Sequence, residues 1–391
     1  MPNPKLIRIT TVPLSLQFLL KGQLAFMQQH FEVVAVSSGP QSELDEVGQR
    51  EGVNTVLVPM TRAITPFQDL KVLWQLYRLF KKEQPHIIHT HTPKAGTVGM
   101  LAAWLAGVPL RFHTVAGLPL LEAVGTKRKL LNFVEKLTYR FSTSIYPNSK
   151  GLYEIIISEK YTKPEKLKVM GHGSSNGIDT GYFDPEKYSG IFKEEFKNEI
   201  GIPSKNFVFL FVGRLVKDKG INELVAVFIE FLKKHHNVSL LLVGPTEDNL
   251  DPLEETTKQQ IYENPNIITT GFQNDVRPYF AISDCLVFPS YREGFPNVPL
   301  QAGAMGLPSI VTNINGCNEI VKHGHNGLII PPKNAKAIEE AMVRMIKEKA
   351  LTKKLASNAR ESIVSRFDQL TLWKLIKEEY DTQLRAAGIN F

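Results

Sequence analysis

Short apolar runs alternate with longer segments of helical periodicity along the first half of the chain. The runs are rich in Val and Ile, and in the segments between them apolar residues recur every three or four positions. Runs of four to eight residues are typical of buried strands, and the longer segments are typical of amphipathic helices. The pattern predicts strands at 5–12, 32–37, 55–58, 86–90, 110–114 and 144–147, with helices at about 17–30, 42–51, 67–83, 93–106, 126–141 and 149–158.

The alternation pauses after residue 170 and then begins again. Residues 171–177 superficially resemble a dinucleotide fingerprint, but a turn-rich segment follows them where that motif needs a helix, so they are interpreted as a connection. The second series predicts strands at 207–213, 239–244, 267–270, 285–288, 309–312 and 328–330, and helices at about 191–199, 220–235, 253–263, 275–280, 300–305, 318–323, 335–348, 350–365 and 368–386.

Repeated strand–helix units fold as parallel sheets with helices on both faces. We therefore expect the α/β class, with two Rossmann-like, doubly wound domains, and the chain of 391 residues has the length for two cores. The expected division is an N-terminal domain, a connecting segment, a C-terminal domain and a final helix, over residues 1–172, 173–190, 191–367 and 368–391.

The net charge of +7 lies entirely in the first half of the chain. Residues 1–190 contain 22 Lys and Arg against 15 Asp and Glu, whereas the remainder contains 24 of each. A basic half indicates a lysine-rich solvated surface, or contact with a membrane surface or an anionic acceptor. The basic residues are not interleaved with aromatic residues, which argues against a nucleic-acid partner.

The cysteines and the N-terminus bear on localisation. Cys285 and Cys317 form no disulfide framework, and the chain runs directly into a strand without a secretory signal. The longest uncharged stretch, 95–110, is shorter than the roughly 20 residues that a bilayer span needs. We expect a cytoplasmic protein, with peripheral contact with the inner face of the cytoplasmic membrane as a further expectation.

Three histidines in the segment 86–91 raise the question of a metal. His89 and His91 lie on one face of a predicted strand, but the sequence supplies no third ligand or flanking carboxylate nearby. We therefore expect no metal site. The basic, amphipathic helix at 126–141 has two interpretations, which are a membrane-surface helix and a core-facing helix with solvated lysines.

Loops that follow the first and fourth strands carry candidate ligand contacts. Thr11 and Pro13 follow the first strand, so they line the sheet edge where ligands bind in doubly wound folds. Thr92 is a predicted N-cap and Pro93 the first helical residue, which places Lys94 in the first turn. A lysine opposes the helix dipole there, so its partner is either a phosphate or carboxylate, or solvent.

The second half contains two strand–loop–helix units with charged loops. Glu293 is a lone acidic residue on a Gly- and Pro-rich turn, and Arg214 and Lys219 lie in the loop after an earlier strand. Two cations so placed can clamp a diphosphate and neutralise the charge that grows on it as it leaves. The sequence has no P-loop Gly-Lys-Ser/Thr and no Asp-x-Asp pair for a divalent metal.

These motifs together resemble those of retaining, metal-independent glycosyltransferases of the GT-B fold, a large family that makes bacterial capsules, exopolysaccharides and glycan precursors. The likeness covers nearly the full chain. It implies a cleft between the two domains and a final helix that crosses back onto the N-terminal domain. The segments that carry it are 176–183, 213–220, 271–276, 289–298 and 316–321.

The resemblance also implies residue roles. Arg214 and Lys219 hold the donor diphosphate, and Glu293 contacts the donor sugar. Thr11, Pro13 and Lys94, singled out above by their positions, are the candidate acceptor contacts. The resemblance implies no cofactor and no metal. The UDP-sugar is the donor substrate. The residues assigned to the nucleotide sugar are Gly271, Phe272, Gly294, Phe295, Pro296, Asn297, Val298, Gln301 and Glu319.

Two positions depart from the family pattern. Gln301 stands where a second glutamate usually binds the ribose, and Ala116 stands where a histidine usually faces the donor sugar. His113 is the candidate that compensates for Ala116 as a catalytic residue, and its alternative is a packed core histidine.

The expected function is transfer of a hexose or N-acetylhexosamine from a UDP-sugar, with retention, to a glycan carried on polyprenyl diphosphate. Two alternatives stay open. One is a nucleotide-sugar epimerase of similar fold. The other is a non-catalytic protein that binds sugar nucleotides, which the departures at Gln301 and Ala116 favour.

Overall fold

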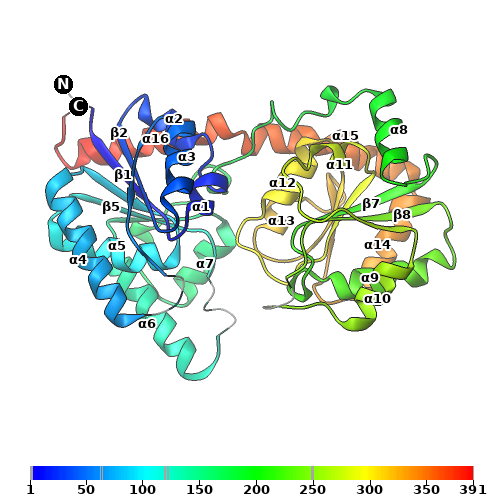
Figure 1. The fold of residues 1–391 in the computed structure, drawn as a ribbon, viewed down its shortest axis with the longest axis horizontal. Helices are drawn as coiled ribbons and strands as arrows, with labels where there is room; N and C mark the ends of the chain where they lie inside the picture. The colour runs from blue at the N-terminus through cyan, green and yellow to red at the C-terminus, as the bar shows by residue number, and fades with distance from the viewer. Residues whose placement is uncertain are drawn as a thin grey trace. The chain divides into compact units, whose positions relative to one another are not determined.

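The structure is a computed structural model that describes residues 3–61, 63, 65–118, 120, 123–247 and 251–390. The chain divides into two compact units, of which the first consists of Met1–Gly177 with Gln369–Phe391 and the second of Ile178–Asp368. Each unit contains a six-stranded parallel sheet flanked by helices (Figure 1). The predicted α/β class, with two doubly wound sheets, is confirmed.

The sheet of the N-terminal unit has the order β3-β2-β1-β4-β5-β6. Because β1 pairs with β2 on one side and with β4 on the other, the strand order reverses between β1 and β4. In open α/β sheets ligands bind at such a switch point, beyond the carboxyl ends of the strands. The strands are β1 (Lys5–Ile9), β2 (Glu32–Ser37), β3 (Asn54–Leu57), β4 (Ile87–Thr90), β5 (Leu110–Val115) and β6 (Ser144–Pro147).

Helices bury both faces of this sheet. Leu6 belongs to a core cluster with residues of α2 and α16, whereas its neighbour Ile7 belongs to a cluster with residues of α4 and α5. Successive residues of a strand point to opposite faces, so two layers of helices are needed. The helices are α1 (Pro13–Phe18), α2 (Gln23–Gln28), α3 (Gln41–Glu51), α4 (Pro66–Glu83), α5 (Pro93–Ala106), α6 (Gly125–Phe141), α7 (Lys150–Ser158) and α16 (Gln369–Ala386).

The final helix, α16, belongs to the N-terminal unit and lies beside α2 in Figure 1. Its Tyr380 hydroxyl contacts the guanidinium of the fully buried Arg8 on β1 and the Nδ1 atom of His89 on β4. The Nε2 atom of His89 lies 2.7 Å from the Thr114 hydroxyl. The return of the last helix to the first domain, which the family resemblance implied, is confirmed.

The histidine segment is part of this buried network. The rings of His89 and His91 stack with centroids 4.2 Å apart, and burial lowers the pKa of both well below the ordinary value. Among the residues that the structure describes, no three His, Cys, Asp or Glu side chains gather in a group that could hold a metal ion.

The predicted helix at 17–30 is wrong, because two short helices, α1 and α2, replace it. The chain breaks at Gly22, whose φ is +77°, and a Cβ atom there would lie 2.7 Å from the Trp373 ring. The break therefore lets α16 approach closely. The predicted strand at 5–12 ends at Ile9, because the Thr11 N–H donates to the Thr92 hydroxyl at 2.9 Å and Pro13 opens α1.

The sheet of the C-terminal unit has the order β12-β11-β10-β7-β8-β9, so its switch point lies between β7 and β10. The strands are β7 (Phe207–Val212), β8 (Val238–Val243), β9 (Ile267–Thr269), β10 (Cys285–Phe288), β11 (Ser309–Thr312) and β12 (Gly327–Ile330). The helices are α8 (Gly190–Glu199), α9 (Ile221–Leu232), α10 (Glu255–Glu263), α11 (Arg277–Ala281), α12 (Asn297–Ala304), α13 (Cys317–Ile320), α14 (Ala335–Lys347) and α15 (Lys349–Phe367).

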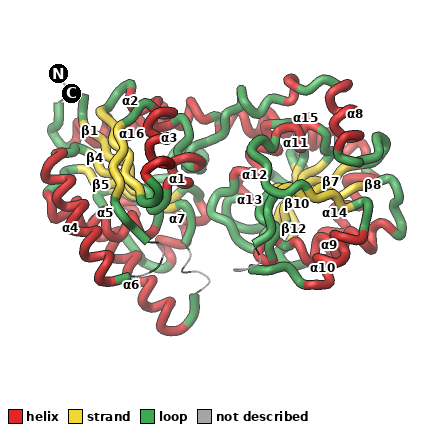
Figure 2. Tube along the Cα trace, in the orientation of Figure 1, coloured by secondary structure: helices red, strands yellow, loops and turns green. Residues whose placement is uncertain are grey.

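The yellow strands of the C-terminal unit lie among its red helices in Figure 2, and the apolar residues form one core cluster. Helix α12 begins at Asn297, three residues before the predicted start. Pro299 lies in its first turn, where proline is tolerated because the N–H groups there have no partner within the helix.

Residues 178–189 belong to the C-terminal unit. Arg360 of α15 donates to the carbonyl oxygen of Phe183 at 2.8 Å and to that of Thr180 at 3.0 Å, which holds the segment against α15. Among the described residues, no helix combines the length and the apolar character that crossing a bilayer would need.

Candidate active site

The loops that follow β7 and β10 form the candidate site. These strands are neighbours, with Leu210 paired to Leu286, and their loops leave the sheet at its switch point. The loop after β7 contains the short 3-10 helix η4 (Lys217–Lys219), and the loop after β10 contains Glu293. Two loops far apart in sequence are therefore neighbours at the position where doubly wound sheets bind ligands.

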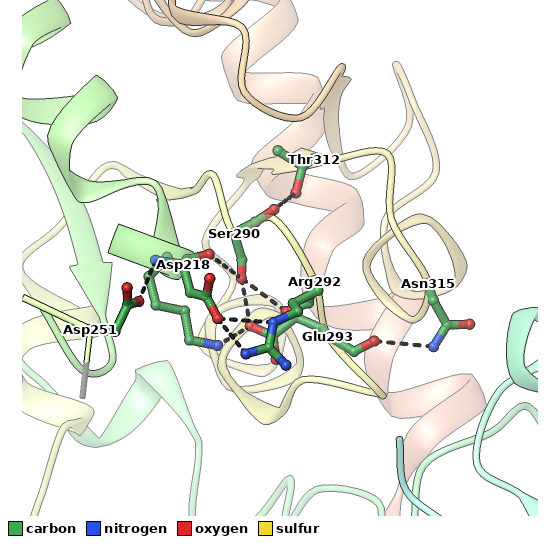
Figure 3. A network of polar contacts seen from close by, with 8 residues as sticks. Asp218, Asp251, Ser290, Arg292, Glu293, Thr312 and Asn315 are labelled. Carbon is green, nitrogen blue, oxygen red and sulfur yellow. Dashed lines mark hydrogen bonds and ion pairs between the residues drawn. The ribbon is translucent and has the colours of Figure 1, made fainter. Parts of the chain in front are cut away.

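Lys219 and Glu293 meet at this position. The Lys219 ammonium forms an ion pair with Glu293 Oε1, and the Ser290 hydroxyl donates to the same oxygen at 2.9 Å. The two charged side chains are 17% and 15% exposed, so they are partly shielded yet reachable. Figure 3 shows Glu293 and Ser290 within a larger network of polar contacts.

A glycine allows the two loops to touch. Gly220 has a φ of +71°, and a Cβ atom there would lie 2.4 Å from the carbonyl oxygen of Pro289. Next to this contact, the Tyr291 N–H donates to the Asp218 carbonyl oxygen at 2.9 Å, and the Asp218 carboxylate pairs with Arg292. Only glycine fits so close an approach in a left-handed conformation, so Gly220 sets the distance between Lys219 and Glu293.

The loop after β11 holds the other side of the Glu293 loop. Asn315 Nδ2 donates to the carbonyl oxygens of Glu293 and Gly294, at 3.3 and 2.5 Å. Gly316 packs so closely that a Cβ atom there would lie 2.4 Å from the Gly294 carbonyl oxygen, and the Thr312 hydroxyl donates to the Ser290 carbonyl oxygen at 2.5 Å. Glu293 therefore sits on a loop braced from both sides (Figure 3).

Helix α12 begins a few residues after Glu293. Its N-cap, Pro296, makes no side-chain capping bond, so the first-turn amides have no side-chain acceptor from that residue. Phe295 is buried against Phe367 with ring centroids 5.5 Å apart, so it can offer a ligand only its backbone. Asn297 is exposed and Gln301, one turn later, is half-buried.

Arg214 and Phe272 lie near the other strands of the sheet. The Arg214 side chain is 54% exposed and its guanidinium pairs with Glu247, which follows β8. Phe272 is 64% exposed and follows Gly271, whose backbone bridges to Gly244 at the end of β8. An exposed aromatic ring beside a glycine turn is a platform on which a planar base can stack.

The switch point of the N-terminal unit carries the other candidate residues. The Thr11 and Thr92 hydroxyl oxygens are 2.6 Å apart, which joins the loops after β1 and β4. Lys94 is 10% exposed, and its ammonium lies 2.7 and 2.6 Å from the two carboxylate oxygens of Asp69 on α4. The carboxylate alternative for Lys94 is thus the one observed, and the solvated one is wrong. Pro13 is the buried first residue of α1.

His113 lies inside the N-terminal unit. Its ring is 2% exposed, its Nδ1 atom lies 2.7 Å from the Thr90 hydroxyl, and Gly96 packs on it so closely that a Cβ atom would lie 2.4 Å from Cε1. Burial lowers the pKa of His113 to about 4. This geometry supports the core-histidine alternative, so the catalytic assignment of His113 is corrected.

Comparisons with known proteins decide the family. The model described as "Glycosyl transferases group 1" matches residues 192–362, and the model of the "Glycosyl transferase 4-like domain" matches residues 23–173. The capsular polysaccharide biosynthesis glycosyltransferase CapM of Staphylococcus aureus is 33% identical over 98% of this chain and 99% of its own length. The chain belongs to the group 1 glycosyltransferase family.

Two further relatives of this glycosyltransferase have more specific names. A UDP-Gal:alpha-D-GlcNAc-diphosphoundecaprenol alpha-1,3-galactosyltransferase of Escherichia coli is 31% identical over 95% of this chain and 97% of its own. An N,N'-diacetylbacillosaminyl-diphospho-undecaprenol alpha-1,3-N-acetylgalactosaminyltransferase of Campylobacter jejuni is 27% identical over 86% of this chain and 88% of its own.

Solved structures agree on the fold of the glycosyltransferase. A glycosyltransferase from Rickettsia africae has a TM-score of 0.81 at 19% identity, over 98% of this chain and 99% of its own. An Anabaena protein in complex with UDP has the same TM-score and identity, over 97% of this chain and 100% of its own. The predicted GT-B fold is therefore confirmed.

The glycosyltransferase uses further residues that the sequence patterns did not single out. Asp218, Ser290, Thr312 and Asn315 hold the Lys219 and Glu293 loops; Ser290, Thr312 and Asn315 lie at or within three residues of a strand end, and Asp218 lies in η4. That placement was readable from the sequence, but their hydrogen-bond partners were not. Glu319 lies in α13, and its backbone carbonyl accepts a bond from Arg366 at 2.9 Å.

Proposed function

We propose that this glycosyltransferase moves a hexose or N-acetylhexosamine from a UDP-sugar, with retention, to a glycan linked to polyprenyl diphosphate. The observation that carries the proposal is the Lys219–Glu293 pair at the switch point of the C-terminal sheet. A cation for the leaving diphosphate and a carboxylate for the sugar lie side by side there, on loops that are braced in place. Preorganised charge of this kind is the main source of catalysis in group transfer.

The diphosphate of the donor binds Lys219, Arg214 and backbone N–H groups of the Glu293 loop and of the first turn of α12, which are those of Gly294, Phe295, Asn297 and Val298. The bond between the anomeric carbon and the diphosphate oxygen breaks, and the cations and amides stabilise the negative charge that appears. The acceptor oxygen forms its bond on the same face, and its proton passes to the departing diphosphate. Glu293 stabilises the positive charge on the sugar without becoming bonded to it.

The uracil base stacks on Phe272 beside Gly271, and Gln301 and Glu319 bind the ribose and sugar hydroxyls. The Anabaena protein of the same fold is in complex with UDP, which supports this nucleotide. Gln301 can donate or accept one hydroxyl bond without adding negative charge near the diphosphate. No divalent cation takes part, because Lys219, Arg214 and the backbone amides neutralise the charge of the diphosphate.

The acceptor is a lipid-linked glycan of surface polysaccharide or glycan assembly. The Escherichia coli and Campylobacter jejuni relatives are both named for substrates carried on diphosphoundecaprenol. The excess of Lys and Arg over residues 1–190 suits an anionic lipid carrier, and the contacts come from Thr11, Pro13 and Lys94. The enzyme acts in the cytoplasm, at the inner face of the membrane.

The test is a panel of UDP-sugars incubated with the full chain and N-acetylglucosaminyl diphosphopolyprenol. We expect UDP release with one of them, only when the acceptor is present, and unchanged by a chelator. NMR of the product should show the anomeric configuration of the donor. Conversion of the UDP-sugar to its epimer without acceptor would support the epimerase, and donor binding without turnover with any lipid-linked glycan would support the non-catalytic alternative.

A further inference from the structure

A cavity of about 710 Å³ lies at the switch point of the N-terminal unit. Thr11 and Thr92, at the ends of the neighbouring strands β1 and β4, form its polar end. Helix α5 forms the base and helices α4 and α6 form the walls. The apolar side chains of its lining include Leu70, Leu73, Val98, Leu101, Leu131 and Val134.

Exposed apolar side chains lie on both helices that form the walls, next in sequence to lining residues. Phe67 and Trp74 on α4 are 91% and 58% exposed, and Phe133 on α6 is 63% exposed. They are the sequence neighbours of the lining residues Pro66, Leu73 and Val134, so both wall helices carry apolar side chains outside the cavity as well as in it. Apolar surface of this extent on a protein marks a site of contact with another molecule.

Lysines lie on the outer side of α6, and in the lining of the cavity the charge of Asp69 is paired with that of Lys94. Lys127, Lys129 and Lys136 of α6 are exposed, and the acidic residue of that helix, Glu135, is buried in the cavity wall. At the polar end, the N-cap of α5, Thr92, makes no side-chain capping bond, and no acidic residue lies in the first turn. First-turn amides without a capping side chain bind phosphate groups.

We propose that this cavity holds the isoprenoid chain of the lipid-linked acceptor, with the diphosphate at the start of α5. The inference rests on the proposed function and adds a site for the lipid part of the substrate. The hydrocarbon chain lies against the leucines and valines of α4, α5 and α6 and leaves past Phe67 and Phe133. The anionic diphosphate thus lies at the polar end of the cavity, and the apolar chain lies along its apolar lining.

An isoprenoid is favoured over the other occupants of an apolar groove. A second copy of the chain would have to fill a deep cavity whose inner end is polar. A membrane acyl chain would fit the apolar lining, but the two relatives named for diphosphoundecaprenol substrates speak for the isoprenoid. The volume of the cavity is within the range of ordinary small-molecule sites, so it takes the first isoprene units and leaves the rest of the chain outside.

Calorimetry on the full chain tests the site, with saturating UDP present to occupy the nucleotide site. The probes are geranylgeranyl diphosphate, geranyl diphosphate, inorganic diphosphate and hexadecyl phosphate. We expect geranylgeranyl diphosphate to bind more tightly than geranyl diphosphate by about a hundredfold, which corresponds to three or four further buried methylenes at about a factor of four each, with the remaining carbons outside the cavity.

The matched variants are Leu101→Trp and Leu105→Trp, one turn apart on α5. Leu101 lines the cavity, whereas Leu105 is 49% exposed and lies outside its lining. Leu101→Trp should weaken geranylgeranyl diphosphate at least about tenfold by filling the cavity, whereas Leu105→Trp should leave binding unchanged. Leu131→Trp, on the wall formed by α6, should repeat the loss, and an unchanged melting temperature would show that each variant folds.

Equal effects of Leu101→Trp and Leu105→Trp would overturn the inference. Equal binding of hexadecyl phosphate and geranylgeranyl diphosphate would overturn the isoprenoid assignment and point to membrane lipid. In turnover, Leu101→Trp should raise KM for a long-chain acceptor and leave kcat unchanged. If no acceptor is glycosylated at all, the proposed function fails while calorimetry still decides the cavity. If transfer proceeds without any dependence on chain length, the cavity assignment alone fails.

Discussion

The two sheets of this glycosyltransferase have the same strand order, but their switch points differ in chemistry. In the C-terminal unit the loops after β7 and β10 bring together a lysine, a carboxylate and a glycine-mediated contact. In the N-terminal unit the corresponding loops, after β1 and β4, open into a cavity of about 710 Å³ with a largely apolar lining. The topology gives each unit a switch point, and the loop residues there decide what it could bind.

Each switch point has a lysine paired with a carboxylate, and the pairs are built differently. Lys219 and Glu293 come from two loops that follow strands, and Lys219 is the last residue of the short 3-10 helix η4. Lys94 and Asp69 come from the first turns of two helices, α5 and α4. We expect the first pair to act on the reaction itself and the second to act on the binding of one substrate.

The largest effect should come from breaking the first pair. Glu293→Ala and Lys219→Ala should each lower kcat by about a hundredfold to a thousandfold, because preorganised charge at the reacting bond is lost. The melting temperature should change little, since both residues lie on loops. Lys217→Ala, an exposed lysine in the same loop, is the control and should keep full activity. A normal rate in either variant would remove that residue from the site.

The next effect should come from moving the loops apart. Gly220→Ala forces a side chain into a left-handed conformation and against the Pro289 carbonyl oxygen, 2.4 Å from the new Cβ atom. We expect a loss of about 2–3 kcal/mol in unfolding free energy, together with a lower kcat. Gly52→Ala is the matched control, because its φ is +66° and nothing lies within 4 Å of the new Cβ atom. Gly52→Ala should lose only about 1 kcal/mol in unfolding free energy, and its kcat should be normal. Equal costs in urea unfolding would contradict the role given to Gly220.

The second pair should affect acceptor binding alone. Lys94→Met leaves the Asp69 carboxylate with hydrogen bonds from Thr65 but no cation beside the cavity, so KM for the acceptor should rise about tenfold while kcat and KM for the UDP-sugar stay unchanged. Adding Asp69→Asn should restore thermal stability without restoring acceptor affinity. Lys81→Met, at the exposed far end of α4, serves as the control. A change in kcat for Lys94→Met would erase the distinction between the two pairs.

The smallest effect concerns Glu135 in the cavity wall. Burial raises the pKa of Glu135 to about 7, against 4.5 as its ordinary value. Between these values the folded chain keeps a proton that the unfolded chain has released, so this group's contribution to stability is lost as the pH rises through 7. The free energy of unfolding of Glu135→Gln, measured by urea unfolding, should therefore rise relative to that of the wild type by about 2 kcal/mol between pH 5 and pH 7.5.

His113 provides the internal contrast for that measurement. Its lowered pKa, about 4, means that the unfolded chain binds a proton below pH 6.5 while the folded chain does not. Its contribution is lost as the pH falls from 6.5 towards 4, opposite to that of Glu135. The wild type and Glu135→Gln both contain His113, so its contribution cancels in the difference between their unfolding free energies. If the difference in unfolding free energy between the two proteins does not change with pH, Glu135 is solvated and burial does not raise its pKa.

The sequence by itself determined the strands, because a strand buried on both faces needs a continuous apolar run that local composition reveals. It also placed Lys219 and Glu293 on loops at strand ends, where motif and family resemblance agree. The division of the helix at 17–30 was decided by Trp373, which lies far along the chain and packs on Gly22. A contact of that kind has no local signal.

Only the tertiary structure decided the partners of single residues and the shape of the N-terminal site. Lys94 pairs with Asp69 on another helix, and His113 is buried against Gly96 and Thr90, although each could have faced a ligand from its position in sequence. The cavity exists because three helices leave space over the ends of two strands. The physical reason is that periodicity reports which face of an element is buried, whereas pairing and empty volume depend on how separate elements pack.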